Sequence, residues 1–228
     1  MFSALGEAFQ LIFSGDHILY QIIGVTLRMT ISSSLVALLI GVPIGTWLGN
    51  ARFRGRKALV IINRAFMGLP PVVCGLFCYL LFSGVGPLRG LHLLYTVTGM
   101  IIAQVMLLLP LCVGMQETYV KGISGKLRET TTGLGIGRGR TLMLTINESR
   151  YEIISIFLFL FGRAMAEVGA VSIVGGAIMF KTNVMTTAIM NYTSMGNFKT
   201  AMALGIVLLF IGLIVNIIVG LIQWTTDK

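Results

Sequence analysis

The sequence predicts an all-helical integral membrane protein, a bundle of about five transmembrane helices. Of its 228 residues, 56% are hydrophobic and 11% are charged, and the mean hydropathy is +0.91. An average soluble domain is roughly 45 to 50% apolar and about 25% charged, so this chain cannot cover a soluble globule with solvated side chains. Because one membrane-spanning helix needs about 20 apolar residues, we expect residues 1–228 to form a single transmembrane domain.

Five apolar runs predict the spans in order. They cover residues 21–49, 58–82, 91–115, 153–180 and 201–224. Pro70 and Pro71 interrupt the second run and Pro110 lies in the third, so we expect kinks in both helices. Residues 1–16 contain no Lys or Arg, and we expect them to form an amphipathic interfacial helix rather than a cleaved signal peptide.

The basic residues predict how the spans are oriented. One side of the predicted bundle holds eleven of the 17 Lys and Arg residues: Arg52, Arg54, Arg56, Lys57, Lys228 and six between residues 116 and 150. The other side holds three, namely Arg89, Lys181 and Lys199. Since basic residues are retained on the cytoplasmic side, we expect the amino terminus outside and the carboxyl terminus inside.

No pattern typical of a catalytic or nucleotide-binding site is found in the sequence. The stretch 133–139 is rich in glycine, but neither register of a dinucleotide fingerprint is complete, and no Gly-Lys-Ser/Thr follows. His17 and His92 are far apart, and the three cysteines lie in apolar runs, where we expect small buried side chains rather than metal ligands. We therefore expect no enzyme activity, no metal and no bound cofactor, which leaves transport or a membrane scaffold.

Charged residues inside the apolar runs are candidates for a transport path, because a charge at the bilayer centre costs at least about 2.5 to 3.5 kcal/mol. Arg163 is expected near the middle of the fourth span, about 18 Å along the helix from Tyr151, with Glu167 one helical turn further. In one interpretation the two form an i, i+4 ion pair; in the other, Arg163 takes part in an anion path. Arg28 and Arg64 lie closer to span ends, where long side chains reach the interface.

Proline and glycine residues are further candidates for the path. Pro70 and Pro71 free backbone carbonyls, which a membrane tolerates only where neighbouring helices or a water-lined cavity satisfy them. A kink that lines a path and a kink that serves packing both remain open at this point. Gly169 and other glycines of the second and fourth spans allow helices to approach closely.

The polar segment between the third and fourth spans contains a motif with a known counterpart. Glu129-Thr-Thr-Thr-Gly-Leu-Gly135 resembles the EAA loop of ABC importer permeases, with an acidic residue, two small residues and a glycine six positions on. Thr130 and Thr131 stand in place of the alanines, and Ile146–Arg150 stands in place of the family's Ile-x-Leu-Pro ending. These departures from the common EAA motif narrow the choice of subfamily among the ABC importer permeases.

Two of the apolar runs extend the resemblance. Gly68–Gly75 and Phe161–Gly176 are similar to segments of the permeases of tungstate-type oxyanion importers, and Met185–Ile189 resembles the same group. Permeases for molybdate and sulfate are near relatives of that family. The resemblance covers the chain from the first span to Trp224.

The resemblance implies a fold and a coupling site. The fold would be that of a type I ABC importer permease, with a cytoplasmic coupling helix between residues 116 and 150. That helix is expected to be short, with Glu129 in its first turn, where a carboxylate is favourable to the helix dipole. The residues implied in coupling to the ATPase are Glu129, Thr130, Thr131, Gly133, Leu134, Gly135 and Arg138.

The resemblance also implies partners and a substrate. We expect a homodimer of permeases in a prokaryotic cell membrane, two ATP-binding subunits that hold ATP and Mg, an external solute-binding protein, and no nucleic acid. The imported anion would be tungstate, with molybdate or sulfate as the alternatives; an ion-gradient-driven carrier is a more distant one. The path candidates that join this assembly are Pro70, Pro71, Arg163, Glu167 and Gly169.

Overall fold

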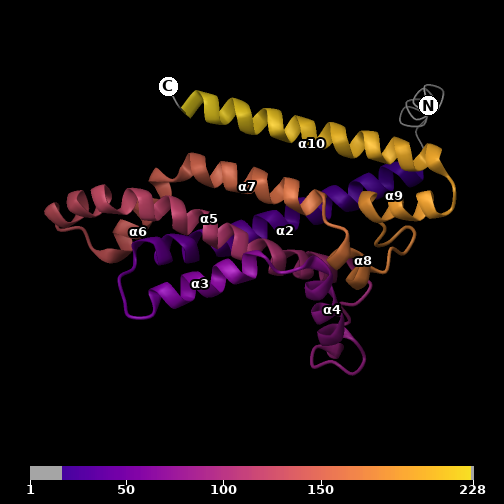
Figure 1. The fold of residues 1–228 in the computed structure, drawn as a ribbon, viewed down its shortest axis with the longest axis horizontal. Helices are drawn as coiled ribbons and strands as arrows, with labels where there is room; N and C mark the ends of the chain where they lie inside the picture. The colour runs from indigo at the N-terminus through magenta and orange to yellow at the C-terminus, as the bar shows by residue number, and fades with distance from the viewer. Residues whose placement is uncertain (1–16, 227–228) are drawn as a thin grey trace.

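The structure, a computed structural model, describes residues 17–226, and the elements in this part of the chain are helical. They are α2 (His17–Asn50), α3 (Arg56–Met67), α4 (Pro71–Phe82), η1 (Arg89–Leu91), α5 (Val97–Gly133), α6 (Arg138–Glu148), α7 (Arg150–Met165), α8 (Gly169–Gly175), α9 (Met185–Ser194) and α10 (Phe198–Thr226). Figure 1 shows α2, α5, α7 and α10 running along the longest axis, while α4 projects away from them. The all-helical fold class is confirmed; the expected amphipathic segment 1–16 lies outside the described residues.

The predicted spans correspond to three long helices and two broken ones. Within the described residues, α2, α5 and α10 are long and apolar enough to cross a membrane, and the number rises to five when each of two bent helix pairs counts as one span. The pairs are α3 with α4, bent by 97°, and α7 with α8, bent by 61°. The second and fourth apolar runs are therefore bent helix pairs, each interrupted more sharply than by a kink, and we refer to them as the broken spans.

The two expected proline effects turn out differently. Pro70 has an extended backbone (φ −63°, ψ 128°) and Pro71 occupies the first turn of α4, where a missing N–H costs nothing. These prolines therefore start a new helix at the bend. Pro110, by contrast, lies inside α5, which continues past it to Gly133. Its carbonyl accepts a hydrogen bond of 3.0 Å from the Asn63 side chain of α3.

A row of glycines brings α2 and α5 together in the centre of the molecule. Gly41, Gly45 and Gly49 recur every four residues, so they share one face of α2. A Cβ atom added at any of them would lie 2.6 to 2.7 Å from a side-chain atom of α5, at Cys112, Gln116 and Val120 respectively. Small residues of this spacing let two membrane helices pack at close range.

The two broken spans meet at their breaks. A Cβ on Gly75 of α4 would lie 2.7 Å from the Cα of Ala170 in α8, and a Cβ on Gly169 would lie 2.9 Å from the Val72 side chain. Val72 directly follows Pro71. The start of α4 and the start of α8 therefore lie against each other, and the packing role expected for these glycines is confirmed.

Helix α9 is an element that the apolar runs did not predict. Its first residue, Met185, donates its backbone N–H to the hydroxyl of Thr26 in α2 (2.9 Å), and that hydroxyl donates to the Ile22 carbonyl (2.7 Å). The helix is only ten residues long and carries several polar residues, so no apolar run marked it. It packs against α10.

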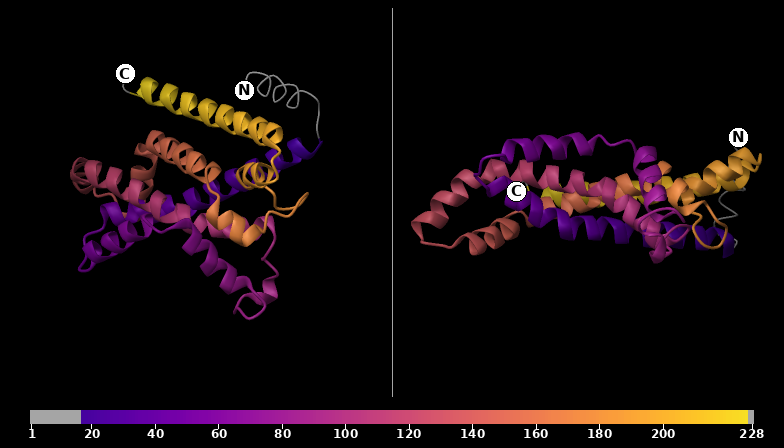
Figure 2. Two further views of the ribbon diagram at one scale, coloured as in Figure 1. Left: turned by 45° about the vertical axis from the view of Figure 1, so that its right-hand side comes forward. Right: turned by 90° about the horizontal axis from the view of Figure 1, so that it is seen from below.

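The links between helices lie toward two ends of the molecule. The α2–α3 link and the α5–α6 turn lie at one end of the long axis, and the α9–α10 link lies at the other (Figures 1 and 2). The two links at the first end carry or adjoin most of the basic residues counted above.

Candidate functional site

The EAA-like motif lies at the carboxyl end of α5. This helix continues to Gly133, so Glu129 lies close to its end. The expectation that Glu129 lies in the first turn of a short separate helix is wrong, because the helix of the third span extends far beyond the apolar run. A carboxylate here lies near the negative pole of the helix dipole, so the dipole does not account for it.

Gly135 ends this helix in a left-handed conformation. Its φ is +69°, the Leu134 N–H bonds to the Thr130 carbonyl (3.1 Å), and the Ile136 N–H bonds to the Thr131 carbonyl (2.9 Å). The second bond and the positive φ define a Schellman C-cap, which favours glycine because it has no Cβ. Gly135 therefore sets the direction in which the chain leaves α5, and α6 begins three residues later.

The turn between α5 and α6 presents an apolar tip at the surface. Leu134 is 69% exposed and Met143 of α6 is 75% exposed, while Glu129, Gly133 and Gly135 are also exposed. Thr131 is buried, with 4% of its surface accessible. Arg138 begins α6, although its side chain lies outside the described part of the chain.

At the other candidate site, Arg163 and Glu167 form an ion pair. The Arg163 Nη1 atom lies 2.9 Å from the Glu167 Oε2 atom, and 4% of the Glu167 side chain is exposed, against 38% of that of Arg163. The second oxygen, Oε1, accepts the backbone N–H of Ala170 at 3.2 Å. Glu167 therefore holds Arg163 and the first turn of α8 at the same time.

The break between α7 and α8 brings most of the path candidates together. Arg163 is in the last turn of α7, Glu167 lies in the break, and Gly169 begins α8. Gly169 contacts Val72, the residue after Pro71. The candidates chosen one by one from the sequence therefore form one neighbourhood at the meeting point of the two broken spans.

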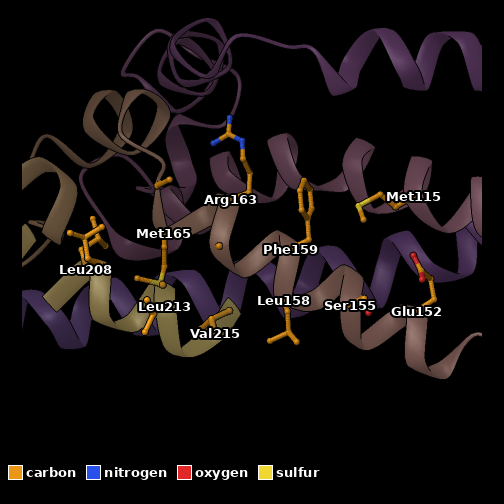
Figure 3. Close-up of a pocket in the computed structure, with 14 residues that line it drawn as sticks. Met115, Glu152, Ser155, Leu158, Phe159, Arg163, Met165, Leu208, Leu213 and Val215 are labelled. Atoms are coloured by element: carbon orange, nitrogen blue, oxygen red, sulfur yellow. The ribbon is translucent and has the colours of Figure 1, made fainter. Parts of the chain in front are cut away.

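A cavity of about 760 Å³ opens between α7 and α10, and Arg163 lines it. Figure 3 shows the Arg163 side chain extending from the last turn of α7, and Glu152 lies in the first turn of the same helix. The rest of the lining is mostly apolar and includes Leu158, Phe159, Met165, Leu208, Leu213 and Val215. Neither Pro70 nor Pro71 is among the lining residues.

Glu117 is a buried acid that the sequence analysis missed. Its Oε1 atom lies 2.7 Å from Nη2 of Arg56, its Oε2 atom lies 3.9 Å from Nη2 of Arg64, and 3% of its side chain is exposed. Arg56 also donates from Nε to the Leu48 carbonyl of α2 at 2.7 Å. Glu117 lies two residues beyond the third apolar run, in the segment that its composition marks as polar. The continuation of α5 is what buries it.

Two glutamines of α5 form further buried polar contacts between helices. Gln104 accepts a hydrogen bond from the Ser33 hydroxyl of α2 (2.7 Å) and donates to the Ala164 carbonyl of α7 (2.7 Å). Gln116 donates to the hydroxyls of Thr46 (2.9 Å) and Ser149 (3.0 Å). Each glutamine therefore ties α5 to two neighbouring parts of the chain.

The three cysteines are buried free thiols, as expected.

Comparison with known proteins establishes the class. Residues 41–226 match the family described as the binding-protein-dependent transport system inner membrane component. The chain belongs to this family of membrane permeases.

Three relatives match over almost their whole length. A tungstate uptake system permease protein of Peptoclostridium acidaminophilum is 35% identical over 95% of this chain and 95% of its own. A probable anion ABC transporter permease protein of Haloferax volcanii is 36% identical, with 89% and 90% covered. A tungstate uptake system permease protein of Campylobacter jejuni is 32% identical, with 96% and 91% covered.

Membership of the family confirms several of the expectations. The chain is a permease subunit of an ABC importer in the inner membrane and is itself not an enzyme, since ATP hydrolysis belongs to a separate subunit. The family also implies an ATP-binding partner and a solute-binding partner. The roles of the individual site residues stay predictions.

Proposed function

We propose that this permease imports an oxyanion, tungstate, as a homodimer driven by two ATP-binding subunits that hold ATP and Mg. The observation that carries the substrate is the similarity to two tungstate uptake permeases along nearly the entire chain. The external solute-binding protein would deliver the anion to the face opposite the α5–α6 turn. No cofactor is assigned to this chain.

The α5–α6 turn is the proposed docking site for the ATP-binding subunit. Leu134 and Met143 expose large apolar side chains there, and a second protein that covers them would remove this surface from water. The Gly135 cap holds the turn in one conformation. We assign the coupling role to Glu129, Thr130, Thr131, Gly133, Leu134, Gly135 and Arg138.

Arg163 is the proposed anion contact in the path. A guanidinium has five N–H donors, and the pair with Glu167 leaves others free to bind an oxyanion in the cavity. The carboxylate also lowers the net charge of the site, which keeps the anion from being trapped. Glu167, Gly169, Pro70 and Pro71 shape the neighbourhood, and the second protomer would supply the other wall.

Uptake by the reconstituted complex tests this proposal. The permease is placed in proteoliposomes with its ATP-binding subunits and solute-binding protein, and internal tungsten, molybdenum and sulfur are measured by mass spectrometry. We expect ATP-dependent tungsten uptake that excess molybdate or sulfate does not abolish. Equal uptake of molybdate would contradict the substrate, and uptake driven by an ion gradient without ATP would contradict the mechanism.

The proposed topology places the amino terminus outside and the carboxyl terminus inside. The distribution of basic residues supports it, because the α2–α3 link and the α5–α6 turn lie at the same end of the molecule. Two variants, Arg54→Cys and Lys199→Cys, test this topology with a thiol reagent that does not cross membranes. In intact spheroplasts we expect labelling at position 199 and none at 54; the native cysteines are buried and give little background.

A further inference from the structure

We propose that the ion pair between Arg56 and Glu117 is a latch: it makes the broken span α3–α4 follow α5 when the ATPase moves the α5–α6 turn, here called the coupling turn. Arg56 and Glu117 would act as positioning residues: they contact neither the anion nor the ATPase. The inference rests on the proposed function, because it assigns a mechanical role within that transport cycle.

The first step is that α5 carries both the residues of the coupling turn and one partner of the ion pair. The helix carries Glu129 near its end and Glu117 twelve residues earlier, which is about 18 Å along a helix axis. The structure shows no break between these two positions. A displacement of the coupling turn is therefore passed to Glu117 by the helix itself.

The second step is that α3 has little else to hold it. None of its residues is fully buried, and among the described elements α5 is its main packing partner. Its specific contacts to α5 are the bond from Arg56 to Glu117, the longer ion pair of the more exposed Arg64 with the same carboxylate (3.9 Å), the bond from Asn63 to the Pro110 carbonyl, and Met67 against Gly114. The Arg56–Glu117 bond lies at the end of α3 nearest the coupling turn.

The third step is that Arg56 also binds the end of α2. Its Nε donates to the Leu48 carbonyl while Nη2 bonds Glu117, so one guanidinium joins α2, α3 and α5. A planar guanidinium with donors in fixed directions holds such a junction in one geometry. An unpaired carboxylate is strongly unfavourable where only 3% of the side chain is exposed, so the latch resists opening.

The fourth step connects α3 to the path. Beyond the bend, α4 packs against α8 through Gly75 and Ala170, and α8 begins two residues after Glu167. Motion of α3 would therefore reach the Arg163–Glu167 pair through α4 and α8. Helix α5 also contacts α7 and α8 directly, so the latch predicts reduced coupling on its loss, with some coupling remaining.

The test measures how many anions are transported per ATP hydrolysed. The main variant, Arg56→Met with Glu117→Leu, removes both charges and fills the space with apolar side chains, a replacement that proteins commonly tolerate. The single variant Glu117→Gln, which keeps the shape of the side chain but removes its charge, is measured in parallel. Lys57→Met is the matched control, because Lys57 is the exposed neighbour of Arg56 in the same helix.

We expect the double variant to assemble with the ATPase and to hydrolyse ATP at about the wild-type rate, while tungsten uptake per ATP falls by about tenfold, a coupling effect of ordinary size. Lys57→Met should keep the wild-type ratio. An unchanged ratio in the double variant, or uptake and ATP hydrolysis that fall in parallel, would overturn the latch. If the wild-type complex shows no ATP-dependent uptake, the proposed function fails instead.

Discussion

Arg163 and Glu167 are joined across the end of α7: the guanidinium lies in the last turn, and the carboxylate that binds it, at 2.9 Å, lies beyond the helix. The carboxylate is buried, whereas 38% of the arginine side chain is exposed and lines the cavity between α7 and α10. One bond from Nη1 therefore anchors the guanidinium, which has further N–H donors.

Arg163→Gln should reduce tungsten uptake by about tenfold or more, because a hydrogen bond to a charged group contributes about 1.5 to 3 kcal/mol. ATPase docking should not change, since the α5–α6 turn is at the end of a different helix. Arg28→Gln is the control: Arg28 is an exposed arginine of α2. The measurement is uptake in proteoliposomes, and equal losses in the two variants would contradict a role for Arg163 in the path.

Gly135→Ala should weaken the binding of the ATP-binding subunit, because alanine in the left-handed region costs about 1 to 2 kcal/mol and distorts the α5–α6 turn. Gly122→Ala, inside α5 with nothing within 4 Å of the added Cβ and outside the assigned coupling residues, should bind normally. Gly135→Asn should retain more binding than Gly135→Ala, since asparagine tolerates this conformation. Binding of the purified subunits to immobilised permease measures all three, and equal affinities would exclude the cap as a determinant of docking.

Gly45→Ala should destabilise the protein by about 1 to 3 kcal/mol, because the added Cβ would meet the Gln116 side chain at 2.7 Å and the Val113 carbonyl at 2.8 Å. Gly24→Ala, in the same helix with nothing within 4 Å, should be neutral or slightly stabilising. Thermal unfolding in one detergent compares the two. A similar unfolding temperature for both variants would contradict the prediction, because α2 and α5 would then accommodate the added methyl group with no loss of stability.

Gln104→Leu should cost about 1 to 3 kcal/mol, because it leaves the buried Ser33 hydroxyl and Ala164 carbonyl without their amide partner. Ser33→Ala combined with Gln104→Leu should recover part of that loss, since the hydroxyl that lost its amide partner is then gone. The same unfolding assay, run as a double-mutant cycle, gives the interaction energy. Strict additivity of the two substitutions would contradict the hydrogen bond.

The candidate site was only partly predictable. The spacing of four residues was sufficient to propose the Arg163–Glu167 pair, because neighbours on one helix face are set by helix geometry. Glu117 could not be found this way: its partner Arg56 is 61 residues away. Its burial also depends on where α5 ends, and the resemblance to the EAA loop implied a separate short helix instead of this continuation.

What the sequence determined by itself is the class of protein and the number and order of apolar runs. Transfer of a helix into a bilayer depends mainly on its own composition, so a local count of apolar residues predicts it. The motif around Glu129 also predicted, from a short stretch of chain, the segment that we propose as the coupling site.

What only the tertiary structure decided is how those runs are broken and which faces meet. The 97° bend before α4, the contact of Gly45 with Gln116, and the three-way junction at Arg56 all depend on residues brought together from distant parts of the chain. Close packing and ion pairing depend on which two helix faces meet. A periodic pattern in the sequence describes the face of one helix and does not say which partner it meets.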